Sequence, residues 1–234
     1  MDPLLSLRDV YVRYPDGTEA LRGVSFDLPP GQRAALIGPN GAGKTSLLLA
    51  IMRGVGFRGS IVIDGLEANR RNEDRCRNRC GMTFQNADDQ LFMPTLLEDA
   101  AFGPLNQGLS ADDARLHAEG AIAAVGLAGL ESRAAHHLSG GQKRAAALAT
   151  VLSMNVRLLL LDEPAANLDH RSRNRVIEIL ADRPEAMLLA THDLDLAGRL
   201  CRRVIVLDEG RMVAEGAANE ILNDRAILSA HGLG

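Results

Sequence analysis

The feature that most constrains this chain is a glycine-rich loop between a predicted strand and a predicted helix. The aliphatic run Ala34-Ala35-Leu36-Ile37 leads into the loop, and residues 46–51 follow it with helical character. This context makes the pattern G-x-x-x-x-G-K-[ST] a phosphate-binding loop rather than a chance match. The residues that we expect to surround the phosphates are Gly38, Pro39, Asn40, Gly41, Ala42, Gly43, Lys44, Thr45 and Ser46.

The residue types in this loop match the chemistry of a nucleoside triphosphate. Gly41 and Gly43 permit backbone angles that turn successive N–H groups inward, and such a nest at a helix N-terminus holds phosphate oxygens. Lys44 supplies a positive charge for the β- and γ-phosphates, and Thr45 offers a hydroxyl to Mg²⁺. The alternative is an ordinary glycine-rich turn with an exposed lysine, which the flanking strand and helix disfavour.

Two acids follow a second apolar run. Residues 157–161 are predicted to form a buried strand, and Asp162-Glu163-Pro164 come directly after it. Ligands bind α/β sheets at the carboxyl ends of parallel strands. We therefore expect Asp162 to organise Mg²⁺ and Glu163 to accept a proton from an attacking water.

Three further stretches stay ambiguous when they are considered alone. Ser139 precedes Gly140-Gly141-Gln142 and a helical run, which fits a second anion site but fits an ordinary serine-capped helix better. Tyr14 ends a predicted strand, where it could stack on adenine or pack within a β lobe. His192 follows the predicted strand 187–191, where it could reach a γ-phosphate or be structural.

The order of these pieces predicts a single α/β domain over residues 1–234. Residues 4–14 and 19–28 are predicted strands joined by Pro15-Asp16-Gly17, which indicates an N-terminal antiparallel β lobe. Helical spacing and turn residues mark an inserted α-helical lobe over about 86–155. The fold class is thus a P-loop NTPase core of RecA-like type with these two additions.

The composition of the chain limits which classes of partner and which cellular compartment we expect. The formal net charge of −4 argues against nucleic acid as a bulk electrostatic partner. Cys76, Cys80 and Cys201 are too few for a disulfide framework, so we expect free thiols in a reducing compartment. The sequence shows neither a signal peptide nor an apolar run of about 20 residues, so we expect a cytoplasmic protein that needs separate membrane partners.

Taken together, these stretches resemble the ATP-binding subunits of ABC transporters over nearly the whole chain. The Leu-Ser-Gly-Gly-Gln stretch at 138–142 carries most of the specificity, because the phosphate loop and the strand before Glu163 occur in many P-loop proteins. The resemblance predicts an ATP hydrolase that needs ATP and Mg²⁺ and works as a head-to-tail dimer.

The resemblance also implies roles for single residues. Tyr14 would stack on adenine, Gln85 would meet the metal and the attacking water, and His192 would sense the γ-phosphate. Lys44 and Glu163 would be catalytic, and Thr45, Gln85 and Asp162 would surround the metal. The residues that would act at the dimer interface, on ATP held by the other subunit, are Ser139, Gly140, Gly141, Gln142 and Asp169.

A narrower resemblance follows Gln85. Residues 88–95 (Asp-Asp-Gln-Leu-Phe-Met-Pro-Thr) and 98–106 look like the ATPases of energy-coupling-factor importers. Leu91, Phe92 and Met93 place apolar bulk where a helix of a membrane partner would dock, or they pack inside the helical lobe.

The short chain favours uptake of cobalt or nickel ions within that group. A vitamin importer, or a soluble ABC switch that acts on ribosomes or DNA, is the alternative. The implied partners are a second ATPase, identical or closely related, together with transmembrane coupling and substrate-capture proteins. The implied location is the cytoplasmic face of the cell membrane.

Overall fold

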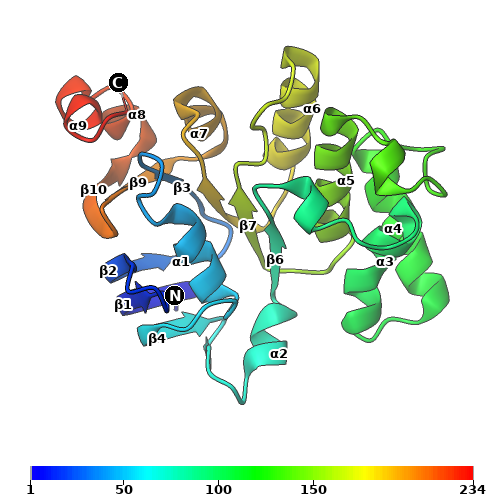
Figure 1. Cartoon of the computed structure of the whole chain (residues 1–234), viewed down its shortest axis with the longest axis horizontal. Coiled ribbons are helices and arrows are strands. Elements are labelled where there is room, and N and C mark those ends of the chain that lie inside the picture. The colour runs from blue at the N-terminus through cyan, green and yellow to red at the C-terminus, as the bar shows by residue number, and fades with distance from the viewer. Residues whose placement is uncertain (1, 234) are drawn as a thin grey trace. The chain divides into compact units, whose positions relative to one another are not determined.

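The computed structural model describes residues 2–233 of the chain, which divide into two compact units. The first unit is assembled from three segments of the chain, residues 2–80, 157–162 and 184–233. The second unit comprises residues 81–156 and 163–183. Figure 1 follows the chain through both units by colour.

The first unit contains a small antiparallel sheet with the strand order β2-β1-β4-β5. Its strands are β1 (Leu5–Arg13), β2 (Glu19–Leu28), β4 (Arg58–Ile63) and β5 (Leu66–Glu67). Buried and exposed positions alternate toward the end of β1, as expected for a sheet with one covered face. The β1–β2 connection is closed by a hydrogen bond from Tyr14 N to Thr18 O.

The larger sheet of the first unit runs β10-β9-β3-β8-β7. Its strands are β3 (Arg33–Ile37), β7 (Leu158–Asp162), β8 (Ala186–Ala190), β9 (Arg203–Asp208) and β10 (Arg211–Ala217). β7, β8, β3 and β9 are parallel, whereas β10 pairs antiparallel with β9. β7 and β8 are buried along their whole length, which explains their continuous apolar sequences. β6 (Cys80–Thr83) begins at the last residue of the first segment.

Helices cover both sheets of this unit. α1 (Lys44–Ile51) contacts β7 of the larger sheet and β1 and β2 of the small one, so it lies between the two sheets. α7 (Leu194–Leu200) packs on β3. The remaining helices are α2 (Glu73–Arg77), α8 (Ala218–Ile221) and α9 (Arg225–Ala230).

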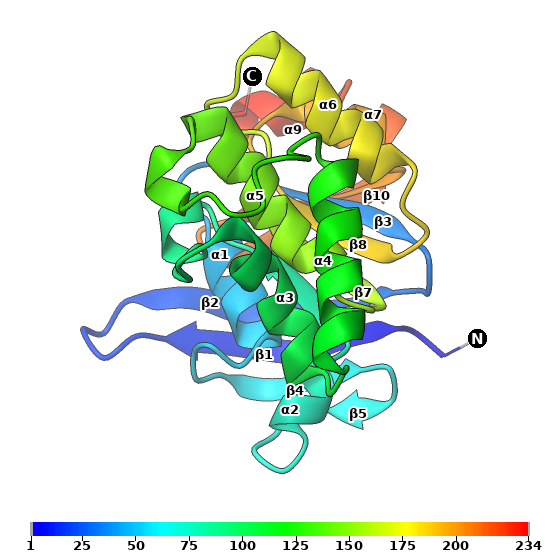
Figure 2. The same cartoon turned by 90° about the vertical axis from the view of Figure 1, so that its right-hand side faces the viewer.

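The second unit is predominantly helical. It contains α3 (Leu96–Asn106), α4 (Ala111–Ala124), α5 (Gly140–Leu152) and α6 (His170–Ala181), with 3-10 turns η1 (Ala87–Asp89) and η2 (Ala135–His137). α3, α4 and α5 pack side by side, as Figures 1 and 2 both show. Buried alanines on α4 and α5 permit this close approach. Gly103 of α3 does so as well, because a Cβ there would lie 2.5 Å from Met154 Cγ.

The predicted fold class is confirmed: an α/β P-loop core carries an antiparallel β lobe and a helical region. The range 86–155, predicted as a helical lobe, lies within the second unit. α2 and α7 were not predicted. All three cysteines are buried free thiols, and burial raises the pKa of Cys80 and of Cys201 to about 12. Within residues 2–233, no helix has the length and apolar character needed to cross a membrane.

Candidate functional site

The glycine-rich loop joins the end of β3 to the start of α1 in the first unit. Gly43 is the N-cap of α1 with φ 102°, and Gly41 has φ 82°. Both values lie in the left-handed region that side chains disfavour, so glycine suits these two positions. The loop therefore ends at the N-terminus of a helix, the geometry expected of a phosphate-binding loop.

Neighbouring strands hold this loop in place. Gly210 N, in the β9–β10 turn, donates to Ala42 O at 3.1 Å, and Arg22 N of β2 donates to Gly210 O at 2.8 Å. A Cβ at Gly38 would lie 2.0 Å from Leu207 O. The backbone of β9 and its turn thus leaves no space for a side chain at the start of the loop.

Lys44 folds back over the loop that precedes it. Its Nζ donates to Gly38 O at 2.7 Å and to Pro39 O at 3.0 Å, and the residue is buried. The ammonium group is thereby fixed beside the loop backbone, where it can bind phosphate oxygens.

Thr45 and Asp162 meet at the carboxyl edge of the larger sheet. Thr45 Oγ1 donates to Asp162 Oδ2 at 2.7 Å, and Asp162 is buried at the end of β7. A hydroxyl and a carboxylate are oxygen donors of the kind that Mg²⁺ prefers, so this pair fits the predicted metal site. Among residues 2–233 no group of three or more His, Cys, Asp or Glu side chains could hold a metal. The predicted set has one such residue, so a Mg²⁺ site here would rely on water and phosphate oxygens for its other ligands.

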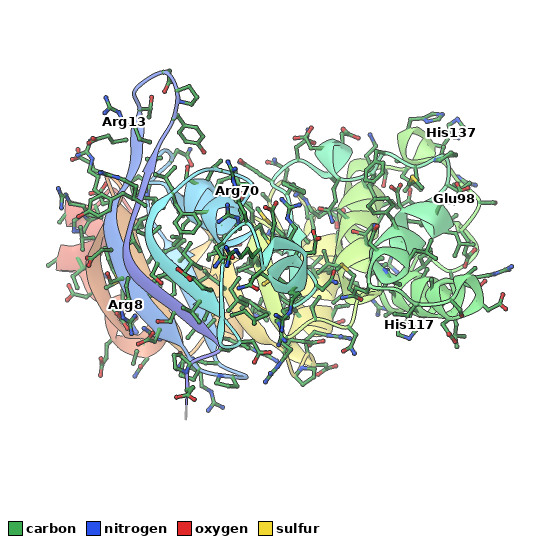
Figure 3. All side chains as sticks on the ribbon, turned by 90° about the horizontal axis from the view of Figure 1, so that it is seen from below. Arg8, Arg13, Arg70, Glu98, His117 and His137 are labelled. Carbon is green, nitrogen blue, oxygen red and sulfur yellow. The ribbon has the colours of Figure 1, made fainter. Side chains whose placement is uncertain are left out.

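Two more predicted residues of the first unit lie near the ends of these strands. Tyr14 and Ser46 share a hydrogen bond of 3.1 Å between their hydroxyl groups, which links the β1–β2 hairpin to α1. Figure 3 shows Arg13, the residue before Tyr14, at the turn of this hairpin. His192 is exposed and follows Thr191, whose N–H donates to Leu36 O of β3 at 3.1 Å. His192 therefore lies at the edge where the phosphate loop begins.

In the second unit, Ser139 is the N-cap of α5 in a complete capping box. Its hydroxyl accepts from Gln142 N at 3.3 Å, and Gln142 Oε1 accepts from Ser139 N at 2.9 Å. Ser139 and Gly140 are exposed, and a cavity of about 690 Å³ opens beside them against α6. The serine-capped helix is therefore present, and its N-terminus is accessible.

The remaining predicted residues also belong to the second unit. Gln85 is exposed and lies two residues after the end of β6. Glu163 is buried and has φ 49°, and Asn167 has φ 59°, both in the left-handed region. Asp169 is the N-cap of α6, where its carboxylate accepts from Ser172 N and Ser172 Oγ. These bonds lower the pKa of Asp169 and keep it charged.

Each unit thus holds part of the predicted set. The first unit holds Tyr14, Gly38–Ser46, Asp162 and His192, and the second holds Gln85, Ser139–Gln142, Glu163 and Asp169. The structure brings together Lys44 with the loop backbone, Thr45 with Asp162, and Tyr14 with Ser46.

The apolar stretch after Gln85 is partly buried and partly exposed: Met93 is half-buried and lies between the two extremes. Leu91 is buried in the second unit, whereas Phe92 is 63% exposed. Phe92 packs edge-to-face on Phe102 with ring centroids 5.1 Å apart. Phe84 and Leu105 are also exposed large apolar residues of this unit. Leu91 therefore packs inside the helical unit, whereas Phe92 is accessible, and docking of a membrane partner at Phe92 stays a prediction.

Sequence reasoning missed three side chains that hold this region. Asp99 Oδ1 accepts from Phe92 N and Met93 N, both at 3.0 Å. Gln90 and Arg144 bind the backbone after β6. Their partners lie up to 60 residues away in the chain, so no local pattern signals these contacts.

Comparison with known proteins matches these features to one family. The family model described as ABC transporter matches residues 21–166. A protein of Methanothermobacter thermautotrophicus named energy-coupling factor transporter ATP-binding protein EcfA is 39% identical over 232 residues, covering 96% of this chain and 74% of that protein.

Solved structures agree with that match. CbiO1 from Clostridium perfringens, described as part of the ABC transporter complex cbiONQ, has a TM-score of 0.83 and 30% identity over all of this chain and 96% of that one. The ATP-binding cassette MJ0796, dimeric with ADP and Pi, has a TM-score of 0.84 over 92% of this chain and 98% of that one. At 24% identity its likeness shows the fold alone.

Proposed function

This chain belongs to the ABC transporter family and is an ATPase of that type, and from this premise we propose that it powers an importer of the energy-coupling-factor type. In this proposal the chain binds and hydrolyses ATP, and separate membrane proteins carry the substrate. The observation that supports ATP chemistry most directly is the phosphate loop with Lys44 fixed on its backbone and Thr45 bonded to Asp162.

We propose the following roles for these residues in hydrolysis. The N–H groups of the loop and Lys44 hold the β- and γ-phosphates, while Thr45 and Asp162 would hold Mg²⁺, which would neutralise phosphate charge. Glu163 accepts a proton from water as the water oxygen bonds to the γ-phosphorus. The bond from that phosphorus to the β–γ bridging oxygen breaks, which releases ADP and phosphate. Gln85 and His192 orient the water and the γ-phosphate.

The accessible N-terminus of α5 supports a composite site in a dimer. The N–H groups of Gly140 and Gly141 lie at a helix start, which favours binding of a phosphate, whereas those of Ser139 and Gln142 are bound within the capping box. We propose that these four residues contact ATP bound to a second subunit, and that Asp169 crosses the same interface. ATP then joins two chains, and its hydrolysis lets them separate.

The energy-coupling-factor assignment draws support from the region after Gln85. Phe92 and Phe102 form an exposed aromatic pair, and Asp99 fixes the backbone that carries Phe92. An exposed apolar cluster of this kind suits a helix of a membrane partner. We propose that this docking places the chain on the cytoplasmic face of the membrane and that the cargo is cobalt or nickel ions. The likeness to CbiO1 of the complex cbiONQ supports the narrower assignment.

The substitution Glu163→Gln tests the ATPase proposal. It keeps the size of the side chain but removes the proton acceptor, so hydrolysis should fall by about 10²–10⁴-fold. An ATP-bound dimer should then accumulate, which light scattering after gel filtration with ATP and Mg²⁺ would detect. Glu119→Gln, on the exposed face of α4, is the matched control and should hydrolyse ATP as the unchanged chain does. A Glu163→Gln chain that stays monomeric with ATP would contradict the dimer mechanism.

Purification of the tagged chain from gently solubilised membranes of its source tests the transport proposal. Mass spectrometry should find hydrophobic coupling and substrate-capture proteins with it, and uptake assays with cobalt and nickel in cells carrying those proteins would test the cargo. Recovery with ribosomal proteins instead would overturn the assignment to transport.

A further inference from the structure

Three side chains join residues 84–90 to α5: Lys143, Arg144 and Gln90. Two come from α5 and one from the loop, and all lie within the second unit. Lys143 Nζ pairs with Asp88 Oδ1 at 2.6 Å. Gln90 and Arg144 make the other bonds, and both act on main-chain groups of residues 84 and 85.

Gln90 uses both ends of its amide. Its Oε1 accepts from Phe84 N at 3.0 Å, and its Nε2 donates to Ala147 O at 2.8 Å and to Thr150 Oγ1 at 2.7 Å. One rigid amide therefore spans the distance from the end of β6 to the middle of α5. The 3-10 turn η1, which ends just before Gln90, fixes the short path between the two ends of the loop.

Arg144 binds the carbonyl groups of Phe84 and of the next residue. Its Nη1 donates to Phe84 O at 3.1 Å and to Gln85 O at 2.6 Å. The N–H of Phe84 is thus bound by Gln90, which is itself bonded to α5, and the carbonyl of Phe84 is bound by Arg144 of α5. Hydrogen bonds from a charged donor are stronger than neutral ones, which makes the Arg144 contacts the firmer part of the junction.

We infer that residues 84–90 and α5 move as one body, and that Gln90 and Arg144 are the positioning residues that join them. The helix begins with Ser139–Gln142, so a displacement of the loop carries these four residues with it. The consequence for transport depends on the proposed function: a partner that docks beside Phe92 shifts Gln85 and the residues that contact the second ATP in one step. The junction itself requires no nucleotide.

Hydrogen exchange of the full chain tests the junction without ATP. Gln90→Met keeps the approximate length of the side chain and removes its three hydrogen bonds. Exchange in peptides covering 84–90 should rise about fivefold, the equivalent of one lost hydrogen bond. Exchange should rise in parallel in peptides covering 139–146, which include none of the partners of Gln90. A rise confined to 84–90 would overturn the inference.

A reciprocal variant starts from the helix. Thr150→Val removes the hydroxyl that accepts from Gln90 and changes little in volume, so exchange at Phe84 and Gln85 should rise although no residue of the loop is altered. No change at these two amides would count against the junction. Gln107→Met is the matched control, because Gln107 makes a similar pair of contacts to the backbone of Asn155. It should leave both regions as they are; a rise in both would show general loosening and overturn the inference.

Kinetics separates positioning from simple stability. Gln90→Met and Arg144→Met should lower kcat for ATP about fivefold to tenfold and leave KM and the ATP affinity of the monomer within about twofold, because the phosphate loop is intact. Arg144→Lys keeps one charged donor and should recover part of kcat. If kcat falls equally in Arg144→Lys and Arg144→Met, Arg144 is not a positioning residue. If hydrogen exchange rises together in residues 84–90 and 139–146 but the chain does not bind ATP, the proposed function is wrong and the inference about the junction is still supported.

Discussion

At the scale of single residues, the phosphate loop depends on the absence of side chains as much as on Lys44. Gly38 is enclosed by the backbone of β9, and Gly43 approaches Ala20 O so closely that a Cβ would lie 2.4 Å from it. Such contacts involve main-chain atoms of strands, which cannot move aside without disturbing the sheet. The loop is therefore shaped by its neighbours before any ligand binds.

Gly38→Ala should destabilise the chain by about 1–3 kcal/mol, because the added methyl group forces the loop away from Leu207. Thermal unfolding followed by circular dichroism would measure the shift in Tm. Gly140→Ala is the control: among the described residues, nothing lies within 4 Å of a Cβ at Gly140. The prediction is wrong if Gly38→Ala and Gly140→Ala have the same Tm.

Asp99 gives a prediction about pH. Burial raises its pKa, opposed by the hydrogen bonds from Met93 N and Phe92 N, and among the described residues its Oδ2 has no hydrogen-bond partner. A carboxyl whose pKa is raised by folding contributes stability below its unfolded pKa, and this contribution is lost as pH rises through the folded value.

Asp99→Asn stays neutral at every pH and keeps an oxygen for the two N–H donors. Its free energy of unfolding should therefore exceed that of the unchanged chain at pH 7.5. The difference should shrink as the pH is lowered, because the raised pKa lets Asp99 take up its proton at a higher pH than an ordinary aspartate. Urea unfolding of both chains at several pH values would measure this, and a difference independent of pH would contradict the assignment.

At the scale of elements, two helices of the second unit begin with the same cap. Ser139 caps α5 by accepting from Gln142 N, and Ser110 caps α4 by accepting from Asp113 N. The two serines thus make similar contributions to helix stability, typically about 1 kcal/mol each. Only Ser139 belongs to the set that we propose contacts ATP.

Ser139→Ala and Ser110→Ala should therefore lower the free energy of unfolding by similar amounts and differ in catalysis. The steady-state rate of ATP hydrolysis should fall in Ser139→Ala and remain near normal in Ser110→Ala, whereas the ATP affinity of the monomer should be unaffected in both. A loss of monomer affinity in Ser139→Ala would mean that Ser139 acts on ATP bound to its own chain.

Elements with a strong local signal could be predicted from the sequence. The turn Pro15-Asp16-Gly17 marked the β1–β2 hairpin, and Ser139 with Gln142 marked the start of α5. α2 escaped prediction because its five residues, Glu73–Arg77, are almost all charged and show no apolar period. α7 escaped because it is only seven residues long and begins only four residues after the end of β8.

In the candidate site, too, features with a local sequence signal could be predicted and contacts between distant residues could not. Its loop could be found because glycine spacing is a local property of the chain. The bond of Thr45 to Asp162 joins residues 117 positions apart, and those of Gln90 to α5 span 57 and 60 positions. Such contacts are set by how the elements pack, which a single sequence does not display.

At the scale of the whole molecule, two exposed apolar side chains distinguish the proposed docking surface from the rest of the surface. Phe92 is the exposed residue that Asp99 and Phe102 hold in place, whereas Leu116 of α4 is similarly exposed, at 67%, without belonging to this cluster. The two residues allow the proposed docking surface to be compared with an ordinary exposed apolar side chain.

Phe92→Asp should abolish recovery of membrane proteins with the tagged chain and leave ATP binding and ATP-dependent dimer formation intact. Leu116→Asp introduces the same charge on α4 and should leave that recovery unchanged. Quantitative mass spectrometry of the two purifications gives the comparison. If both variants lose the membrane proteins equally, the effect is one of surface charge and not of the Phe92 cluster.

The three-segment construction of the first unit has a consequence for synthesis on the ribosome. β3 lies between β8 and β9, so its neighbours are translated about 150 and about 170 residues after it. β3, the apolar strand that leads into the phosphate loop, therefore has neither of its partner strands while residues 81–156 are being translated. Those residues form most of the second unit and are continuous in sequence, so they can fold first. We therefore expect a nascent chain that ends before β8 to bind chaperones, and we expect the sheet that carries the phosphate loop to be completed only after β9 has been made.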